Sequence, residues 1–323
     1  MPGPTRDLTP AGVRAPAEPN DPVPVVEERI AARLRATGLD PATVAALAVA
    51  ALTEDLAGGM DVTTAATVPA AAFGQADVVA RSAGVVAGLP VAEAVFWLAS
   101  PGDRVQCTER AADGDVVAAG QSVLTVAGPI SGLLTGERTA LNLLCHLSGV
   151  ATLTRLWVDE VAGTGAQIRD TRKTTPGLRA LEKYAVRCGG AQNHRIGLYD
   201  MVLIKENHIA AAGSLSGAIT AARRVAPTLP VEVEVESLAE LQEALSAGPD
   251  IILIDELSLA DMRKAVEINR AHQHPAKLEA SGSVSLDTVR NIAETGVDFV
   301  SVGGLTKHVR AIDLSMRLEF TVK

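Results

Sequence analysis

A basic stretch between Arg169 and Lys205 stands out in an otherwise acidic chain. It holds eight Lys and Arg residues against three acidic ones, a local balance of +5, whereas the whole chain of 323 residues has a formal net charge of -9. Lys173, within this stretch, is the first lysine of the sequence. Cations concentrated in one place of an acidic protein indicate a site for a small, highly charged anion. A nucleic-acid surface would be basic over a wider area.

Two short β-branched runs in this stretch end in charged residues. The run QIR is followed by residues 170–173, DTRK, and the run MVLI by residues 205–208, KENH. Between them the segment CGGAQNHR carries His194 and Arg195, and its glycines allow close approach to a ligand. Guanidinium groups bind carboxylate or phosphate in a bidentate manner, and lysine adds a point charge. The cations predicted to form the anion site are Arg172, Lys173, Arg195 and Lys205. Those expected on the surface of the intervening helix are Arg179, Lys183 and Arg187.

The segment VEVEVES, residues 231–237, alternates valine and glutamate with a period of two. One face of this strand is therefore predicted to carry only valine and to pack against helices, while the other turns Glu232, Glu234 and Glu236 toward the interior of a barrel. Buried carboxylates must be paired or must coordinate a metal. These carboxylates, with Asp255 at the end of the next strand, would neutralise interior cations, bind ribose hydroxyls or hold Mg²⁺.

The last two predicted strands end in small residues. Ser281-Gly282-Ser283 follows one of them and Val302-Gly303-Gly304 follows the other. Backbone N–H groups on glycine turns that precede helices form cradles for phosphate, and barrels commonly bind phosphate after their last two strands. The two turns together predict a phosphate site.

The chain after Gly128-Pro129 repeats one pattern, in which six short β-branched runs alternate with helical segments. Strands that alternate with helices predict βα units and a parallel sheet. None of the units carries a GxGxxG turn, which favours a closed barrel over an open doubly wound sheet. In barrels the active site lies at the carboxyl ends of the strands, where this sequence places its charges.

The first part of the chain has a different texture. Residues 1–24 are rich in proline and lack apolar periodicity, which predicts a disordered lead-in. Helices are predicted from about Val25 and over about 42–56, and Gly58-Gly59 is expected to end the second helix. Residues 73–130 are typical of strands and turns around one short helix. We therefore predict an N-terminal α/β sandwich over 25–135, with 310–323 as a candidate addition to it, and a catalytic αβ barrel over 136–309.

The composition excludes several classes of protein. Aromatic residues make up only 2% of the chain, which counts against the stacking platforms that bind nucleic acid or sugars. The three cysteines, Cys107, Cys145 and Cys188, have no metal-site spacing and form no even disulfide set. We find neither a secretory signal pattern nor an apolar run long enough to span a bilayer, so a cytoplasmic protein without membrane partners is expected.

Several long motifs, running from about Ala51 to the C-terminus, match one family. They are ALTEDLAGGMDVTT, RSAGVVAGLPVAEAVF, GERTALNLLCHLSGVAT, DTRKTTPGLRALEKYAV, NHRIGLYD, IKENH, VEVEVES and EASGSVSLDTVRNIAETGVDFVSVGGLT. On these motifs the chain resembles quinolinate phosphoribosyltransferase, also called carboxylating nicotinate-nucleotide pyrophosphorylase. The resemblance implies an α/β fold with an N-terminal open α/β sandwich and an incomplete TIM-like αβ barrel. It also implies a homodimer in which each subunit covers the barrel mouth of its neighbour, with higher assembly left open.

The activity that the resemblance implies is a step of NAD biosynthesis. Quinolinate and phosphoribosyl pyrophosphate react with each other in the presence of Mg²⁺ to give nicotinate mononucleotide, pyrophosphate and CO₂. Lys173, Glu234 and Asp255 would be catalytic, and the two acids would hold the ribose hydroxyls and the metal. Arg138 of the partner subunit would reach quinolinate. The carboxylates and phosphates of the substrates would be bound by Thr171, Arg172, Lys173, His194, Arg195 and Lys205. The 5′-phosphate would be bound by Ser281, Gly282, Ser283, Val302, Gly303 and Gly304.

The sequence departs from the family pattern at several positions. Ala191 replaces a usual third glycine, Glu256 replaces a common Asn, and Ser283 replaces a common Gly. Lys307-His308 stands where the family usually has His-Ser, which leaves the role of that histidine open. These departures bear on substrate geometry more than on the class of reaction.

Three alternatives remain open from the sequence. The nearest is a sister transferase of the same fold that acts on another acid or base, such as the relatives linked to molybdenum transport. A Schiff-base lyase using Lys173 or Lys205 is a second class, although the neighbouring arginines disfavour it. The third is a sensor that binds phosphorylated metabolites without releasing pyrophosphate.

Overall fold

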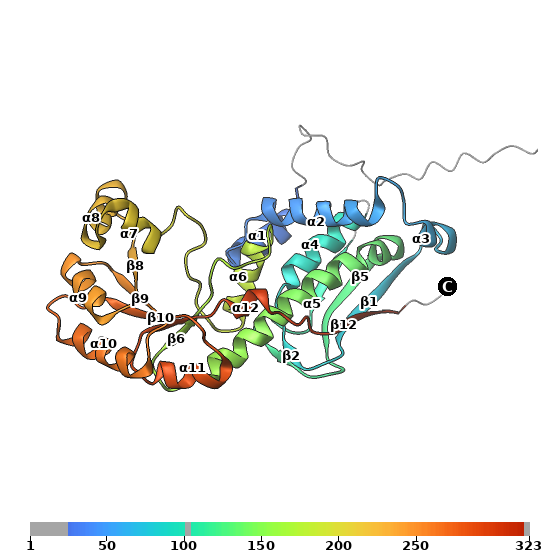
Figure 1. Cartoon of the computed structure of the whole chain (residues 1–323). Coiled ribbons are helices and arrows are strands. Elements are labelled where there is room, and N and C mark those ends of the chain that lie inside the picture. The colour runs from blue at the N-terminus through green and yellow to red at the C-terminus, as the bar shows by residue number, and fades with distance from the viewer. Residues whose placement is uncertain (1–24, 101–104, 320–323) are drawn as a thin grey trace, which may run out of the picture. The chain divides into compact units, whose positions relative to one another are not determined.

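The computed structural model describes residues 25–100 and 105–319 (Figure 1). The predicted lead-in over residues 1–24 lies outside the described residues. The chain divides into two compact units, one formed by Met1–Ser148 with Ala311–Lys323 and the other by Gly149–Arg310. The boundary predicted between residues 135 and 136 falls inside helix α5 (Ile130–Glu160), which continues from the first unit into the second. Because that helix is unbroken, no turn signal in the sequence marks the change of unit.

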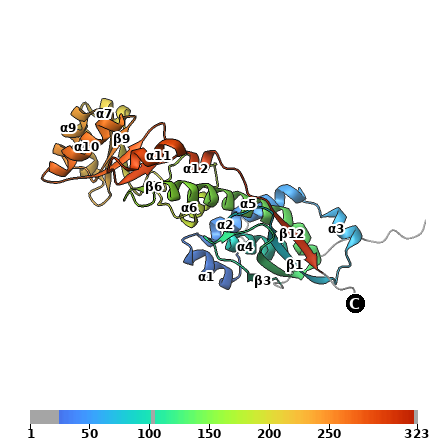
Figure 2. The same cartoon turned by 90° about the horizontal axis from the view of Figure 1, so that it is seen from below.

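The first unit is built on a four-stranded sheet in the order β12-β1-β5-β3, in which all the pairs are antiparallel. Figure 2 shows β1 and β12 side by side, although they come from opposite ends of the chain. The bounds are β1 Phe73–Ala80, β2 Gly84–Val85, β3 Gln106–Glu109, β4 Val116–Val117, β5 Ser122–Pro129, β12 Leu314–Glu319, α1 Glu28–Ala36, α2 Pro41–Leu56, α3 Val62–Thr67 and α4 Leu89–Ala99.

Helices pack on this sheet because that contact removes their apolar faces from water. α4 is buried over its first eight residues, and Phe96 on it shares one core with Leu52 of α2 and Leu124 of β5. Asp40 caps α2 by accepting hydrogen bonds from two backbone amides, as expected at an N-cap. The helix ends at Leu56, and its C-cap, Ala57, has a left-handed conformation with φ 46°, one residue before the predicted glycines.

No single described helix is both long and apolar enough to cross a membrane. α1 and α2 meet the test of length and composition only as a pair, with a bend of 112° between them. In the first unit α2 buries Val44, Ala48 and Leu52.

The second unit contains the six predicted βα strands in one parallel sheet, in the order β6-β11-β10-β9-β8-β7. Figure 1 shows helices α9, α10 and α11 running along the outside of this sheet. The strands are β6 Gln167–Arg169, β7 Val202–Ile204, β8 Val231–Val235, β9 Ile251–Asp255, β10 Lys277–Ser281 and β11 Phe299–Ser301. The helices are α6 Arg179–Cys188, α7 Glu206–Ala212, α8 Leu215–Val225, α9 Leu238–Ala247, α10 Leu259–Ala271, α11 Leu286–Ala293 and α12 Gly304–Lys307.

The closed barrel predicted from the strand pattern is wrong, because in the described part of the chain the sheet is open between β6 and β7. The incomplete barrel that the family resemblance implies is confirmed. The first strand, β6, pairs with the last, β11, as closure requires, but β6 and β7 form no pair among the described residues. The free edge of β6 is instead occupied by the glycine-rich connection, since Gln192 donates to Ile168 O at 2.9 Å and accepts from the Asp170 amide at 3.2 Å. A long connection that pairs with the strand edge replaces the missing strand contact.

Serine residues start several helices of the second unit. Ser214, Ser237 and Ser258 occupy the N-cap positions of α8, α9 and α10, and each side chain accepts a hydrogen bond from the amide three residues later. This satisfies a backbone donor that the first helical turn leaves without a partner. A serine therefore begins three of the helices of this unit, α8, α9 and α10.

Gly189 allows the end of α6 to approach α5 closely. Its φ of -71° is ordinary for any residue, so backbone freedom does not require glycine there. A Cβ atom at this position would lie 2.6 Å from Ala151 O and 2.5 Å from Thr154 Cβ.

We predict that Gly189→Ala lowers the free energy of unfolding by about 1–3 kcal/mol, because the helices must separate to admit a methyl group. Urea unfolding measures the change. Gly248→Asn is the control, because a Cβ at Gly248 meets nothing within 4 Å and asparagine tolerates its left-handed φ of 70°. If the two variants have equal stability, close packing of α5 on α6 is not what selects glycine.

Candidate active site

The inner face of the parallel sheet carries the acidic side chains. In the register of β8, β9 and β10, Glu234 and Glu279 lie in one row across the sheet. Glu232 and Asp255, two residues from that row on their own strands, face the same side, since side chains alternate along a strand. Glu232 and Glu234 are buried, which confirms their predicted interior position. Glu236 lies past the end of β8 and is exposed, so its predicted place inside the barrel is wrong.

Lys205 and Glu234 form an ion pair at the mouth of the sheet. Lys205 follows the last residue of β7 and is the N-cap of α7, and its Nζ donates to a carboxylate oxygen of Glu234 on the neighbouring strand. Burial raises the pKa of Glu234, while Lys205 opposes that shift. The structure therefore brings together one predicted cation and one predicted carboxylate.

Asp255 is the second carboxylate of the mouth. It is half-buried at the end of β9, and its negative charge adds to the rise in the pKa of Glu234. Two carboxylates on adjacent strands, on one face and close enough to repel, offer the oxygen ligands that Mg²⁺ prefers. The donor set fits the predicted magnesium site.

The ends of β6 and β11 meet through Lys173. Val302 donates its amide to Arg169 O at 2.9 Å, and Thr306 Oγ1 donates to Lys173 O at 2.8 Å. A Cβ atom on Gly303 would lie 2.9 Å from Lys173 Cδ, so the lysine side chain runs directly across the glycine. Thr171 Oγ1 accepts from the Lys173 amide at 3.0 Å and fixes the turn. Lys173 is exposed and therefore available to an anion above Gly303.

The predicted phosphate turns have free donors. Among the described residues, the backbone amides of Gly282, Ser283 and Gly303 donate to no acceptor. Gly282 has φ 121°, which only glycine adopts readily, and it follows Ser281 at the end of β10. Unused N–H groups on turns at the ends of β10 and β11 are what an anion cradle requires.

Asp170 anchors the loop that carries His194. Its carboxylate accepts from Lys183 Nζ at 2.6 Å, from the His194 amide at 2.7 Å and from Asn193 Nδ2 at 2.8 Å. Lys183 Nζ also donates to His194 O at 3.0 Å. Burial raises the pKa of Asp170 and lowers that of Lys183, and in both cases the opposite charge of the partner opposes the shift. The pair ties the end of β6 to the loop through α6.

The predicted surface position of Lys183 is wrong. Lys183 is fully buried, because α6 turns this side chain inward to Asp170. Arg179 is half-buried and donates to Thr174 Oγ1 at 3.0 Å and to Ile196 O at 3.3 Å. Arg187 is exposed, as predicted.

Arg172 and Arg195 lie close enough to influence each other. Burial lowers the pKa of Arg195, and the positive charge of Arg172 adds to the shift. Arg195 donates to Met201 O at 3.3 Å, whereas the buried Nε of Arg172 has no partner in the described part of the chain. Two guanidinium groups held near each other, one with an unused donor, favour an anionic ligand.

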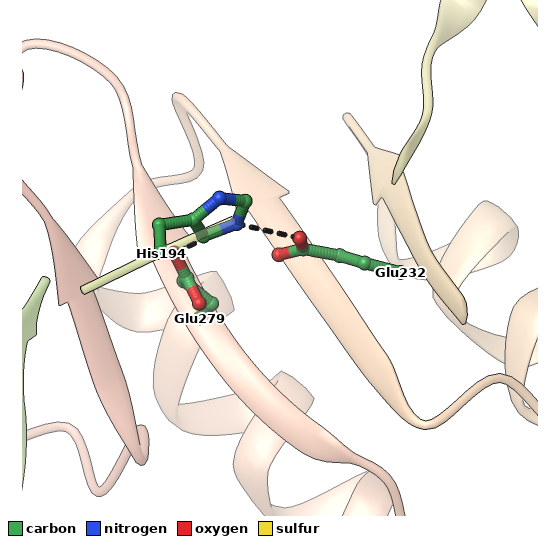
Figure 3. Close-up of side chains that lie close together, drawn as sticks. All are labelled: His194, Glu232 and Glu279. Atoms are coloured by element: carbon green, nitrogen blue, oxygen red, sulfur yellow. Dashed lines mark hydrogen bonds and ion pairs between the residues drawn. The ribbon is translucent and has the colours of Figure 1, made fainter. Parts of the chain in front are cut away.

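His194 belongs to a buried network below the mouth (Figure 3). Its Nε2 lies 2.7 Å from Glu232 Oε2 and 3.7 Å from Glu279 Oε1. These three ligand atoms are close enough to hold a metal ion. However, Arg169 Nη1 lies 2.6 Å from Glu279 Oε2 and Ser301 donates to Glu279 Oε1. A fixed guanidinium repels a divalent cation, so we assign the cluster as a charge network that orients His194.

Arg138 lies in the first unit, on the part of α5 before Ser148, and its side chain is exposed. The remaining predicted site residues lie in the second unit. The role of Arg138 in a partner's site therefore stays a prediction.

Comparison with known proteins shows the family of this chain. A family model described as the quinolinate phosphoribosyl transferase C-terminal domain matches residues 150–317, and the model of the N-terminal domain matches residues 61–148. The chain belongs to this family. The carboxylating nicotinate-nucleotide pyrophosphorylase of Mycobacterium leprae is 49% identical over 268 residues, which cover 83% of this chain and 94% of that protein. The crystal structure of NadC from Streptococcus pyogenes has a TM-score of 0.82 and 40% identity, covering 88% of this chain and 99% of that one.

The sequence did not predict a part in the site for three residues. Asp170, in the motif DTRK, and Glu279, in the segment KLEASGS, are not among the predicted site residues. The signal was present for Glu279, which precedes Ser281 by two residues and so shares its face of the strand. For Lys183 no local signal existed, since a lysine on an amphipathic helix is normally exposed.

Two departures from the family pattern have a structural place. Ala191 is buried and donates its amide to Val186 O at 3.3 Å. His308 is exposed near the second phosphate turn, where a Cβ on Gly304 would lie 3.7 Å from its Nδ1. His308 and Gly304 also line one cavity with Trp157.

We predict that Lys183→Met lowers the free energy of unfolding by about 3–5 kcal/mol, because it leaves the Asp170 carboxylate buried without its countercharge. Urea unfolding measures this. Lys264→Met is the matched control, because Lys264 is exposed and, among the described residues, forms an ion pair only with Glu267 at 3.5 Å. A change within about 1 kcal/mol is expected for it. A Lys183 variant as stable as the control would show that the buried pair does not anchor the loop.

Proposed function

We propose that this chain joins quinolinate to phosphoribosyl pyrophosphate and releases pyrophosphate and CO₂, giving nicotinate mononucleotide. The observation that carries the proposal is the carboxyl edge of one parallel sheet in a member of this family. Arg172 and Lys173 follow β6, Lys205 follows β7 and pairs with Glu234, and Asp255 ends β9. The product is the one in the name of the relatives that are 43–49% identical. A dicarboxylate and a sugar pyrophosphate together require both cations and carboxylates.

Quinolinate carries carboxylates on two neighbouring ring carbons, one of which is bonded to the ring nitrogen. The guanidinium groups of Arg172 and Arg195 would bind these carboxylates, and His194, oriented by Glu232, would add a donor at the same loop. Lys205 would contribute positive charge on the other side, next to Glu234. Binding both carboxylates fixes the ring so that its nitrogen faces the sugar carbon.

The ribose and its leaving group would lie nearer to β8, β9 and β11. Glu234 and Asp255 would accept from the ribose hydroxyls and would hold Mg²⁺, which neutralises pyrophosphate oxygens when bound. Lys173, fixed across Gly303, would stabilise the negative charge that accumulates on the departing pyrophosphate. Ser281 to Ser283 and Val302 to Gly304 would bind the 5′-phosphate, with the free amides of Gly282, Ser283 and Gly303 as donors.

The order of bond changes follows from the chemistry of the substrates. The bond between the anomeric carbon and pyrophosphate breaks, and the ring nitrogen forms a bond to that carbon, which has oxocarbenium character meanwhile. The carboxylates of Glu234 and Asp255 would stabilise this positive charge. The nitrogen then carries a positive charge, so loss of CO₂ from the adjacent carbon leaves a carbanion that the pyridinium stabilises. That carbon takes up one proton to complete the product.

We predict that the purified chain with quinolinate, phosphoribosyl pyrophosphate and Mg²⁺ releases CO₂ and pyrophosphate in equal amounts. Replacing quinolinate by nicotinate should give no CO₂. A protein that binds the substrates without releasing pyrophosphate would be a sensor, and one that releases no CO₂ would be a sister transferase. Either result contradicts the proposal.

Lys173→Ala should lower kcat by about 10²–10³, the usual cost of removing one group that stabilises developing negative charge. Chromatographic detection of nicotinate mononucleotide measures the rate. Lys264→Ala, which removes an exposed helix lysine of the same unit, should keep full activity. Similar activity in both variants would exclude Lys173 from the chemistry.

We propose further that a second copy of the chain supplies Arg138. In support, Arg138 is exposed, and Leu198 and Tyr199 next to the Arg195 turn keep 73% and 74% of their surface accessible. Adjacent exposed apolar side chains are what a subunit interface buries. The dimer would then have two sites, each with Arg138 from the partner subunit.

Mixing two inactive variants tests this arrangement. Arg138→Ala and Lys173→Ala should each be nearly inactive, and refolded mixtures should regain part of the activity. In a hybrid dimer one site has both changes and the other has neither. If mixing restores nothing while each variant keeps its native circular dichroism, the shared site is wrong.

We also propose a cytoplasmic location. All three cysteines are free thiols, the state that a reducing compartment maintains. Fractionation of the source cells would test it, and some curated plant relatives are named as chloroplastic.

A further inference from the structure

The side chain of Glu256 lies against the first phosphate turn. Glu256 follows Asp255 at the end of β9 and has a left-handed backbone with φ 52°, which is uncommon for a residue other than glycine. A Cβ atom on Gly282 would lie 2.7 Å from Glu256 Cδ and 2.9 and 3.0 Å from its two carboxylate oxygens. The whole carboxylate therefore rests on the Cα of Gly282.

Glu256 contacts all three residues of this turn. Ser283 Oγ donates to Glu256 Oε1 at 2.8 Å, and the Glu256 amide donates to Ser281 O at 3.2 Å. The carboxylate thus takes the hydroxyl of Ser283, which is a donor that a phosphate oxygen would use. Two of the positions at which the sequence departs from the family pattern, 256 and 283, are therefore hydrogen-bonded to each other.

A carboxylate and a phosphate compete for such a place. A phosphate monoester carries about -1.5 to -2 charges at pH 7 and needs hydrogen-bond donors around it. The amides of Gly282 and Ser283 are free donors within the described residues, but the charge of Glu256 lies directly beside them. Like charges at van der Waals distance repel, so both anions cannot occupy the turn at full strength.

Displacement of the carboxylate requires little rearrangement. Glu256 and Ser283 are both exposed, and their bond is one hydrogen bond within reach of water. Glu256, Ser281 and Ser283 line a cavity of about 210 Å³ that extends to Met262 of α10 and Ile292 of α11. The side chain has space to leave the turn while the backbone stays in place.

We propose that Glu256 is a specificity-determining residue that competes with the 5′-phosphate of the sugar substrate for the Ser281–Ser283 turn. Binding of the phosphate then requires the carboxylate to release Ser283, whose hydroxyl turns to the phosphate. This rests on the proposed function only for the identity of the phosphate. The chain binds sugar phosphates more weakly than it would with a neutral side chain at this position.

Calorimetric titration with ribose 5-phosphate tests the competition, because this probe carries the 5′-phosphate and cannot react. Glu256→Gln keeps the length of the side chain and removes its charge, and its Kd should be about tenfold lower than that of the wild type, about 1.4 kcal/mol. Glu256→Asn should do the same and also suits the left-handed backbone. Glu243→Gln on α9, which removes an exposed charge away from the turn, should leave the Kd unchanged.

Two further measurements separate competition from a change in the fold. The difference in Kd for ribose 5-phosphate between the wild type and Glu256→Gln should become smaller as the salt concentration rises, because salt screens exposed charges. In the full reaction Glu256→Gln should lower KM for phosphoribosyl pyrophosphate and leave KM for quinolinate unchanged.

Equal or weaker binding of ribose 5-phosphate by Glu256→Gln would overturn the inference; weaker binding would mean that Glu256 helps to hold the sugar phosphate. Failure of the wild type to form nicotinate mononucleotide would contradict the proposed function alone, because the titration needs no turnover. No binding of ribose 5-phosphate by any variant would refute the competition at this turn.

Discussion

The buried ion pair between Asp170 and Lys183 is the constraint on which the binding loop depends. Neither charge would persist alone in the interior, because burial shifts the pKa of each toward its neutral form and the partner opposes the shift. The same carboxylate holds the amide of His194 and the side chain of Asn193. Through one aspartate, therefore, the end of β6, helix α6 and the loop before Arg195 acquire a fixed relation.

Two ion pairs lie on the inner face of the sheet. Arg169 pairs with Glu279 and Lys205 pairs with Glu234, while His194 is hydrogen-bonded to Glu232. Arg172, Lys173 and Arg195 have no acidic ion-pair partner within the described ranges. The cations without partners gather at the carboxyl ends of the strands, which is why that edge suits anionic substrates.

The open seam between β6 and β7 also serves the site. Where a closed barrel would place a strand contact, the chain places a connection that carries α6, His194 and Arg195. Gln192 covers the edge of β6 and leaves no row of free backbone groups there. A loop at this seam can bring donors over the mouth, whereas another strand would have closed it.

The sequence by itself determined the βα pattern, the inner and outer faces of β8 and the strand ends that carry charge. These features are local, since a period of two or a charged residue after a β-branched run depends only on neighbours in the chain. The pattern could not determine whether the sheet closes, because closure depends on the pairing of β6 and β7. Nor could it reveal that Lys183 is buried against Asp170, 13 positions away in sequence, or that Glu256 contacts Gly282, 26 positions away. Tertiary structure decided these points, because burial and contact between distant residues exist only once the strands are in register.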